Sequence, residues 1–189
     1  MQQFTLLRPD FFIRRSCGFT GVELLVVVGT VAILAALAIP SFIGTLERYR
    51  VRRAVEALTA TIYYARTEAI RRGGHVTLRK DTPQGCATET GRLWDCGWTV
   101  FVDVDENGTF NAATDTVLQT SGIPAGTSIV QSQNKAYIKM DRWGEMAGLS
   151  ALSFSVQSKT GASANHVTAI CISAGGRLRT LPGESACTR

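Results

Sequence analysis

The segment around Gly18 constrains this chain more than any other part of its sequence. A basic leader, residues 1–18, ends at Gly18, and an apolar run opens at Phe19 and continues almost without polar residues to Ile39. An ordinary secretory signal has its small-residue cleavage site after the apolar core. Here the glycine comes before the apolar run. Cleavage at this point would therefore leave the apolar helix on the mature protein.

The apolar run, residues 19–39, is long enough to cross a membrane. It comprises 21 residues, which as a helix rising ~1.5 Å per residue span a hydrocarbon core of ~30 Å. Arg14 and Arg15 precede it, a charge bias that keeps the N-terminus cytoplasmic and sends the rest of the chain across the membrane. Glu23 lies inside the run and needs a cationic partner, because a charge in a membrane helix costs about 3 kcal/mol. The α-amine exposed by cleavage would be such a partner.

This arrangement resembles the type IV prepilin signal, in which a dedicated peptidase cuts after the glycine. The resemblance implies cleavage between Gly18 and Phe19, N-methylation of Phe19, and a part for Glu23 in assembly with other subunits. A signal anchor with an incidental glutamate is the alternative, and it differs in cleavage and in the purpose of Glu23. The positions that carry the resemblance are Gly18, Phe19, Thr20, Glu23, Leu24, the apolar run and Pro40.

Residues 40–72 are predicted to continue the helix as an amphipathic segment. An apolar stripe at spacings of three and four indicates a face that packs on a globular domain. Gly73-Gly74 is predicted to end the helix. The stripe consists of Val51, Ala54, Val55, Leu58, Ile62, Ala65 and Ala69.

Residues 73–189 are predicted to form a β-rich domain. Short runs rich in Val, Ile, Thr and aromatic residues alternate with turn signals such as Asn107-Gly108 and Gly175-Gly176. This pattern favours a small antiparallel β-sandwich packed against the helix, an α+β fold. The predicted strands are residues 75–79, 98–104, 116–120, 128–131, 136–140, 152–156 and 166–172.

Three further segments are similar to the FimT/GspH family of minor pilins and minor pseudopilins: residues 97–108, 140–144 and 170–179. The similarity covers nearly the whole mature chain and implies a pilin-like fold. It implies other pilin or pseudopilin subunits, the prepilin peptidase and the inner membrane as partners. It also implies a single-pass anchor with a periplasmic C-terminal domain, and a pilus or pseudopilus after assembly.

Five cysteines are present, and Cys17 would be lost with the leader. The remaining four, Cys86, Cys96, Cys171 and Cys187, would lie on the oxidising side of the membrane and predict two disulfides, for which three connectivities are possible. Pairing that is local in sequence, Cys86–Cys96 and Cys171–Cys187, closes the shortest loops and is the pairing we expect. A zinc site would need C-x-x-C-type spacings, which the chain lacks.

Net charge alone does not predict a nucleic-acid partner. The chain carries +5 at pH 7, but from Gly73 onward ten basic residues are balanced by ten acidic ones. A local cluster remains at Gly176-Arg177-Leu178-Arg179. On an extended segment Arg177 and Arg179 share a face about 7 Å apart, close to the roughly 6–7 Å between successive phosphates of one strand. Arg189 could join them.

In the FimT branch of the family, a Gly-Arg-x-Arg motif near the C-terminus is associated with DNA capture during natural transformation. Carried over to this chain, the motif falls on Gly176, Arg177 and Arg179 and implies duplex DNA as a partner, bound without sequence preference. One alternative is a solvated hairpin whose arginines blunt the edge of a sheet. The other is a structural minor pseudopilin of type II secretion that has no nucleic-acid partner.

The segment Asp103-x-Asp105-x-Asn107-Gly108 matches the first half of a calcium loop. The bidentate glutamate of such a loop is missing, since Thr114 occupies its place and Asp115 follows. A hairpin turn at Asn107-Gly108 explains the same residues and is the interpretation we prefer.

No catalytic site and no cofactor are expected. The chain has two histidines, His75 and His166, each inside a predicted strand, and no nucleophile at a recognised spacing from either. The sequence thus predicts a substrate of a peptidase rather than an enzyme.

Overall fold

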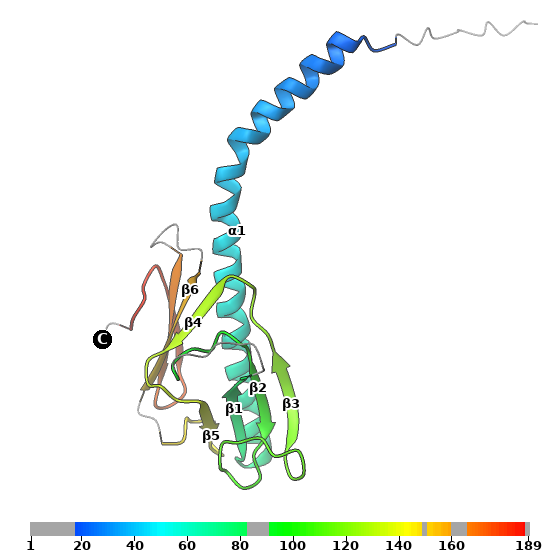
Figure 1. The fold of residues 1–189 in the computed structure, drawn as a ribbon. Helices are drawn as coiled ribbons and strands as arrows, with labels where there is room; N and C mark the ends of the chain where they lie inside the picture. The colour runs from blue at the N-terminus through cyan, green and yellow to red at the C-terminus, as the bar shows by residue number, and fades with distance from the viewer. Residues whose placement is uncertain (1–17, 83–90, 149–150, 160–165, 188–189) are drawn as a thin grey trace, which may run out of the picture. The chain divides into compact units, whose positions relative to one another are not determined.

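The computed structural model describes residues 18–82, 91–148, 151–159 and 166–187. Within these ranges one helix, α1 (Gly21–Arg72), precedes eight strands (Figure 1). The strands are β1 (Val76–Lys80), β2 (Trp98–Val102), β3 (Thr116–Ser121), β4 (Thr127–Gln131), β5 (Tyr137–Met140), β6 (Ala151–Ser158), β7 (Val167–Ser173) and β8 (Leu178–Pro182).

The strands form two antiparallel sheets of four strands each. The first has the order β3-β2-β1-β5 and the second the order β4-β6-β7-β8. Strand β8 pairs with β7 alone and is therefore an edge strand, in register with Cys171 opposite Arg179. The predicted α+β fold, a helix packed on an antiparallel sandwich, is confirmed.

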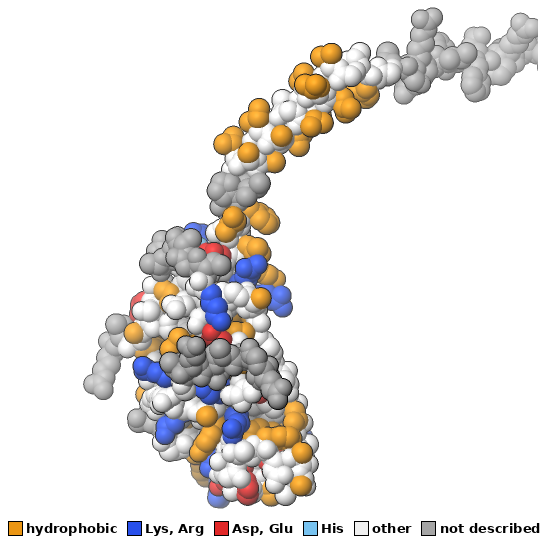
Figure 2. Space-filling view, in the orientation of Figure 1, with side chains coloured by type: hydrophobic (Ala, Val, Ile, Leu, Met, Phe, Trp, Pro, Cys, Tyr) orange, Lys and Arg blue, Asp and Glu red, His pale blue; other side chains and the backbone are white. Residues whose placement is uncertain are grey.

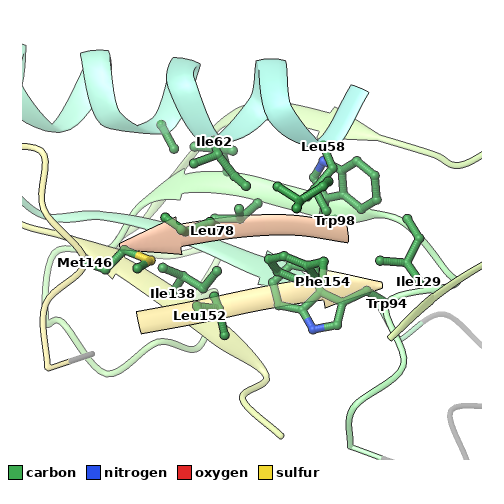
Figure 3. Close-up of a cluster of buried hydrophobic side chains, with 14 of the residues drawn as sticks. Leu58, Ile62, Leu78, Trp94, Trp98, Ile129, Ile138, Met146, Leu152 and Phe154 are labelled. Carbon is green, nitrogen blue, oxygen red and sulfur yellow. The ribbon is translucent and has the colours of Figure 1, made fainter. Parts of the chain in front are cut away.

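The core lies between the apolar stripe of α1 and the two sheets. Every residue of the predicted stripe is buried, and Figure 3 shows Leu58 and Ile62 reaching from α1 towards Leu78 and Trp98. The indole Nε1 of Trp98 donates a buried hydrogen bond of 3.1 Å to Thr61 Oγ1. Burial of each large side chain stabilises the fold by about 1.5–3 kcal/mol. The stripe therefore holds the helix on the sheets.

Residues up to Ser41 form a unit distinct from Phe42–Arg189. Every residue from Gly21 to Leu37 is exposed. The segment is almost entirely apolar in sequence, and its visible face carries mainly hydrophobic side chains (Figure 2). By length and hydropathy, no single helix in the described ranges could span a membrane. The two parts of α1 on either side of residues 38–41, Gly21–Leu37 and Phe42–Arg72, meet the length and hydropathy requirement only when they are taken together as a bent pair.

The prediction that both histidines lie inside strands is wrong. His75 precedes β1 and has a φ of 58°, a left-handed conformation that does not fit a strand. His166 precedes β7 and is buried. Its Nδ1 lies 3.1 Å from Glu47 Oε2, and Arg48 Nε donates to its Nε2 at 2.9 Å. Both histidines thus belong to the junctions between α1 and the sheets.

Candidate nucleic-acid interface

The predicted Gly-Arg-x-Arg segment forms the turn and first residues of the β7–β8 hairpin. Ser173 N donates to Arg177 O at 3.0 Å and Gly176 N donates to Ser173 O at 2.9 Å. The hydroxyl of Ser173 accepts a further bond from Arg177 N at 3.2 Å. These bonds close the turn just before β8 begins at Leu178, so the backbone that carries both arginines is fixed.

Gly176 is required at this turn for two independent reasons. Its φ is 72°, a region that residues with a Cβ adopt at a cost. A Cβ placed there would also lie 3.0 Å from Gly144 O and 3.1 Å from Arg66 Cζ. The glycine of the motif therefore lets the hairpin turn approach a second turn and the helix.

Arg66 of α1 connects these parts, and sequence reasoning missed it. Its Nη1 donates to Gly176 O at 2.9 Å, and its Nη2 lies 3.4 Å from Gly175 O. Gly144 gives the side chain room, because a Cβ there would lie 2.6 Å from Arg66 Cγ. Arg66 precedes Gly176 by 110 residues, and nothing local in the sequence distinguishes it from the other arginines of the helix.

The structure brings Arg177 and Arg179 together on one exposed surface. Both side chains are exposed, whereas Leu178 between them is half-buried and packs against the core. Neither guanidinium has a hydrogen bond or an ion pair with the part of the chain that the structure describes. Both remain available to an outside anion. The third predicted member, Arg189, lies outside the described residues.

A disulfide between Cys171 and Cys187 lies beside the two arginines. Its Cα atoms are 5.9 Å apart, and Cys171 is the residue opposite Arg179 in the β7–β8 ladder. The bridge ties the chain beyond β8 back to β7. Cys96 is also disulfide-bonded, and its expected partner Cys86 lies outside the described residues.

A shallow cavity of about 420 Å³ adjoins Arg177 and Arg179. Its lining includes Ser132, Ser153 and Ser173 and, over most of its area, apolar residues such as Leu152 and Ile172. Guanidinium and hydroxyl groups are the side chains that most often contact phosphate oxygens and sugars. The two arginines and the serines at the edge of this cavity are therefore, among the described residues, the groups that could contact phosphate and sugar.

The positive charge around this site is local. Glu145 Oε1 lies 3.8 Å from the position of a Cβ on Gly175, so an acidic group borders the cluster. On the face drawn in Figure 2, the visible Lys and Arg side chains lie in separate groups, and acidic side chains lie among them. A partner held here would contact a few charges and not a continuous basic band.

The predicted hairpin that contains Asn107-Gly108 is present, but its connection is much longer than these two residues. Strands β2 and β3 are antiparallel neighbours, but residues 103–115 connect them, and the left-handed residues are Glu106 and Gly108. The loop is organised by Asp103, which is fully buried. Its carboxylate accepts bonds from Gly108 N at 2.8 Å, Asn107 N at 3.1 Å and Thr77 Oγ1 at 2.7 Å.

The half calcium loop is partly assembled in space. Carboxylate oxygens of Asp103, Asp105 and Asp115 lie within 4.8 Å of one another. Asp115 accepts bonds from Asn111 N and Val104 N, and the first of these lowers the pKa of its carboxyl below the ordinary value. Backbone N–H groups already donate hydrogen bonds to the carboxylates of Asp103 and Asp115. These carboxylates therefore order the loop, and they do not by themselves define a metal site.

The residues of the expected cleavage and assembly site lie at the start of α1. Gly18 and Phe19 precede the helix and are exposed. Thr20 accepts a bond from Glu23 N at 3.3 Å through its Oγ1, which is the N-cap half of a capping box. Thr20 thus has a local structural role, and Glu23 lies in the first turn of the helix.

A long N-terminal helix packed on two four-stranded antiparallel sheets defines this protein as pilin-like. Two crystal structures of the type IV minor pilin FimU from Pseudomonas aeruginosa share the fold, each at 17% identity. One has a TM-score of 0.54 and covers 70% of this chain and 93% of FimU. The other has a TM-score of 0.57 and covers 72% and 91%. At this identity the likeness describes the fold alone.

The sequence model of the type II transport protein GspH family matches residues 54–176. This is more than half of the chain, and the protein therefore belongs to the GspH family of minor pilins and pseudopilins. None of the curated proteins matches it. The family match ends at Gly176, one residue before Arg177, so the family assignment by itself carries no statement about the arginines.

Proposed function

We propose that this minor pilin binds DNA through Arg177 and Arg179 and contributes to DNA uptake by a pilus-like filament. The observation that supports the proposal is that both guanidiniums are exposed and have no partner among the described residues. They lie on a hairpin that is fixed by Arg66 and by a disulfide. A fixed hairpin loses little conformational entropy on binding. The contacts available are to phosphate and sugar, so binding has no sequence preference.

The strength of this binding follows from the number of contacts. Two or three arginine contacts give a slope of roughly −2 to −3 in log K against log salt concentration. Non-specific binding of this kind has a Kd of roughly 10⁻⁴–10⁻⁶ M. Several copies in one filament would raise the apparent affinity through avidity.

The test compares two charge-matched double variants of the full-length chain in a non-ionic detergent. R177Q/R179Q removes the proposed contacts, whereas R50Q/R53Q removes the same charge from α1. Fluorescence anisotropy with a labelled 30-base-pair duplex, measured over a series of salt concentrations, gives the affinity and the slope. We expect R177Q/R179Q to abolish most of the binding and R50Q/R53Q to leave it nearly unchanged.

Equal loss in both variants would show a diffuse charge effect, and no loss in R177Q/R179Q would remove the support for DNA uptake. The function that then remains is that of a structural minor pseudopilin in type II secretion, meeting only proteins. Its family and its fold are those of structural pilins, and neither function is enzymatic.

The same proposal includes how the protein reaches the filament. A prepilin peptidase removes residues 1–18, Phe19 becomes the N-methylated first residue, and residues 19–39 anchor the chain in the inner membrane with residues 73–189 in the periplasm. Glu23 then pairs with the α-amine of a neighbouring subunit. The glycine before an apolar run and the single carboxylate within that run support this sequence of events.

A further inference from the structure

The turn that contacts Gly176 carries a solvent-exposed tryptophan. The side chain of Trp143 is 73% exposed, whereas those of Trp94 and Trp98, the other tryptophans of the chain, are fully buried. Tryptophan and arginine are enriched among the residues that dominate binding energy at interfaces, and here an exposed tryptophan lies near exposed arginines. This residue has no role in the core or in the proposed phosphate contacts.

The backbone that presents Trp143 is fixed in place. Asp141 Oδ1 accepts bonds from Trp143 N and Glu145 N, both at 2.9 Å, and Asp141 N donates to Glu145 O at 3.0 Å. On either side of the turn, Met140 and Met146 are buried and pair with each other. The backbone at Trp143 is therefore fixed, and its indole is open to solvent.

The tryptophan turn and the arginine turn touch. A Cβ on Gly176 would lie 3.0 Å from Gly144 O, and Arg66 contacts both glycines. Trp143 and Arg177 are each the chain neighbour of one of these glycines. With 3.8 Å between consecutive Cα atoms, the Cα atoms of Trp143 and Arg177 lie within about 15 Å, a span of two to three nucleotides of a single strand.

The chemistry of this combined surface points to single-stranded DNA. We propose that the indole of Trp143 stacks on a base while Arg177 and Arg179 hold the neighbouring phosphates, so that the site prefers single strands to duplex. A side chain that projects from the surface can stack only on a base that is free of its own stack. Single-strand binding sites combine such aromatic platforms with basic grooves.

Charge complementarity favours DNA over a protein partner at this surface. Arg142 beside Trp143 is exposed, and it adds a third cation to Arg177 and Arg179. The acidic neighbours are Asp141, whose carboxylate accepts backbone N–H groups, and Glu145. A protein partner would need apolar surface instead, and among the residues named here beside Trp143 it would find Ile70, which lies next to Gly144 and is half exposed. The protein alternative is therefore one outcome of the test.

The experiment uses the full-length chain in a non-ionic detergent and two probes, a 20-nucleotide oligothymidylate and a 20-base-pair duplex. Because the other two tryptophans are buried, emission that DNA quenches comes from Trp143. We expect the oligothymidylate to quench this emission in the wild type. W143A should weaken binding of the single strand by about five-fold or more, the lower end of the range for losing one base–aromatic stack, and binding of the duplex by less than two-fold.

Two further variants control for fold and chemistry. W143F should retain most of the single-strand affinity while losing the quenchable emission, because phenylalanine can still stack. Y63A removes another exposed aromatic side chain, on α1, and should leave both affinities unchanged. Circular dichroism of W143A should match the wild type, because the side chain is exposed.

This inference depends on the proposed function, and the variants separate the two. If R177Q/R179Q loses DNA binding and W143A does not, the phosphate site stands and the stacking proposal is wrong. If no variant affects binding, both are wrong. Equal weakening of both probes by W143A, without quenching in the wild type, also overturns stacking. W143A protein that binds DNA normally but fails to bind purified pilin subunits would show that Trp143 is a protein contact.

Discussion

Replacing Gly176 by alanine tests the geometry on which the candidate site depends. At a φ of 72° an alanine costs about 1–2 kcal/mol relative to its ordinary conformations. Its Cβ would also press on Gly144 O at 3.0 Å and on the Arg66 guanidinium at 3.1 Å. Displacing Arg66 weakens its charge-assisted hydrogen bond to Gly176 O. Losing such a bond at a half-buried position lowers the free energy of unfolding by about 1–2 kcal/mol. The total expected loss of stability is roughly 2–4 kcal/mol.

Gly183→Ala provides a matched control for backbone strain. Gly183 has a φ of 82° and no atom within 4 Å of a Cβ position, so alanine there costs only the conformational part, about 1–2 kcal/mol. Unfolding is followed by the fluorescence of the buried tryptophans during thermal denaturation in detergent. A chain of this size loses roughly 2–4 °C per kcal/mol, which predicts a fall of about 5–15 °C for G176A. A loss no larger than that of G183A would refute the argument that the close approach matters.

Four further perturbations have defined outcomes. Replacing both Cys171 and Cys187 by serine should cost about 3 kcal/mol in urea denaturation, because the loop is reopened in the unfolded state; an unchanged midpoint would contradict this. The pKa of Asp115 is lowered in the folded state, so its carboxylate stabilises the fold above the unfolded pKa of about 3.9, and this contribution is lost as the pH falls through the folded pKa. Melting temperature should then depend less on pH between 5 and 3 in D115N than in the wild type, and identical slopes would argue against the proposed role. Gly18→Val should leave uncleaved precursor in the membrane fraction. If mass spectrometry of the wild-type protein finds a mature N-terminus other than Phe19, the expected cleavage site is wrong. Glu23→Leu should be inserted and cleaved but poorly incorporated into sheared filaments, because the neighbouring α-amine is left unpaired in low dielectric; normal incorporation would assign the charge another purpose.

The sequence predicted the helix and its buried face well because both depend on local periodicity. The seven stripe residues are all buried, and each predicted strand overlaps an observed one. The sequence pattern did not predict strand β8, because its residues Arg179 and Thr180 are polar and lie on an exposed edge. They leave little alternation of apolar and polar residues to detect. Patterning finds elements that bury one face and misses those that do not.

Loop geometry was predicted less well because it depends on contacts made across the fold. The hairpin after β2 was predicted from Asn107-Gly108, but the shape of its long connection is set by the buried carboxylate of Asp103. This carboxylate also accepts a bond from Thr77 on another strand. The same limitation hid Arg66, whose contact with Gly176 joins residues 110 positions apart. A single sequence contains no signal for a contact between residues so far apart in the chain. Gly176, which makes room for Arg66, could be identified as part of the Gly-Arg-x-Arg motif.

The balance of charge in the β domain limits how this protein could hold DNA. Residues 73–189 carry ten basic and ten acidic residues and therefore no net charge, so the excess of positive charge in the unit Phe42–Arg189 comes from the arginines of residues 41–72 on α1. Charges farther from a site than a Debye length of about 8 Å are largely screened at physiological salt. At the hairpin itself the two arginines supply the close-range attraction, and with so few contacts a single subunit would release DNA readily. A filament that repeats the site would convert these weak contacts into avidity, and partial release of some contacts would let the strand move without leaving the filament. Weak, local and repeated contacts suit a protein that must capture DNA and then give it up.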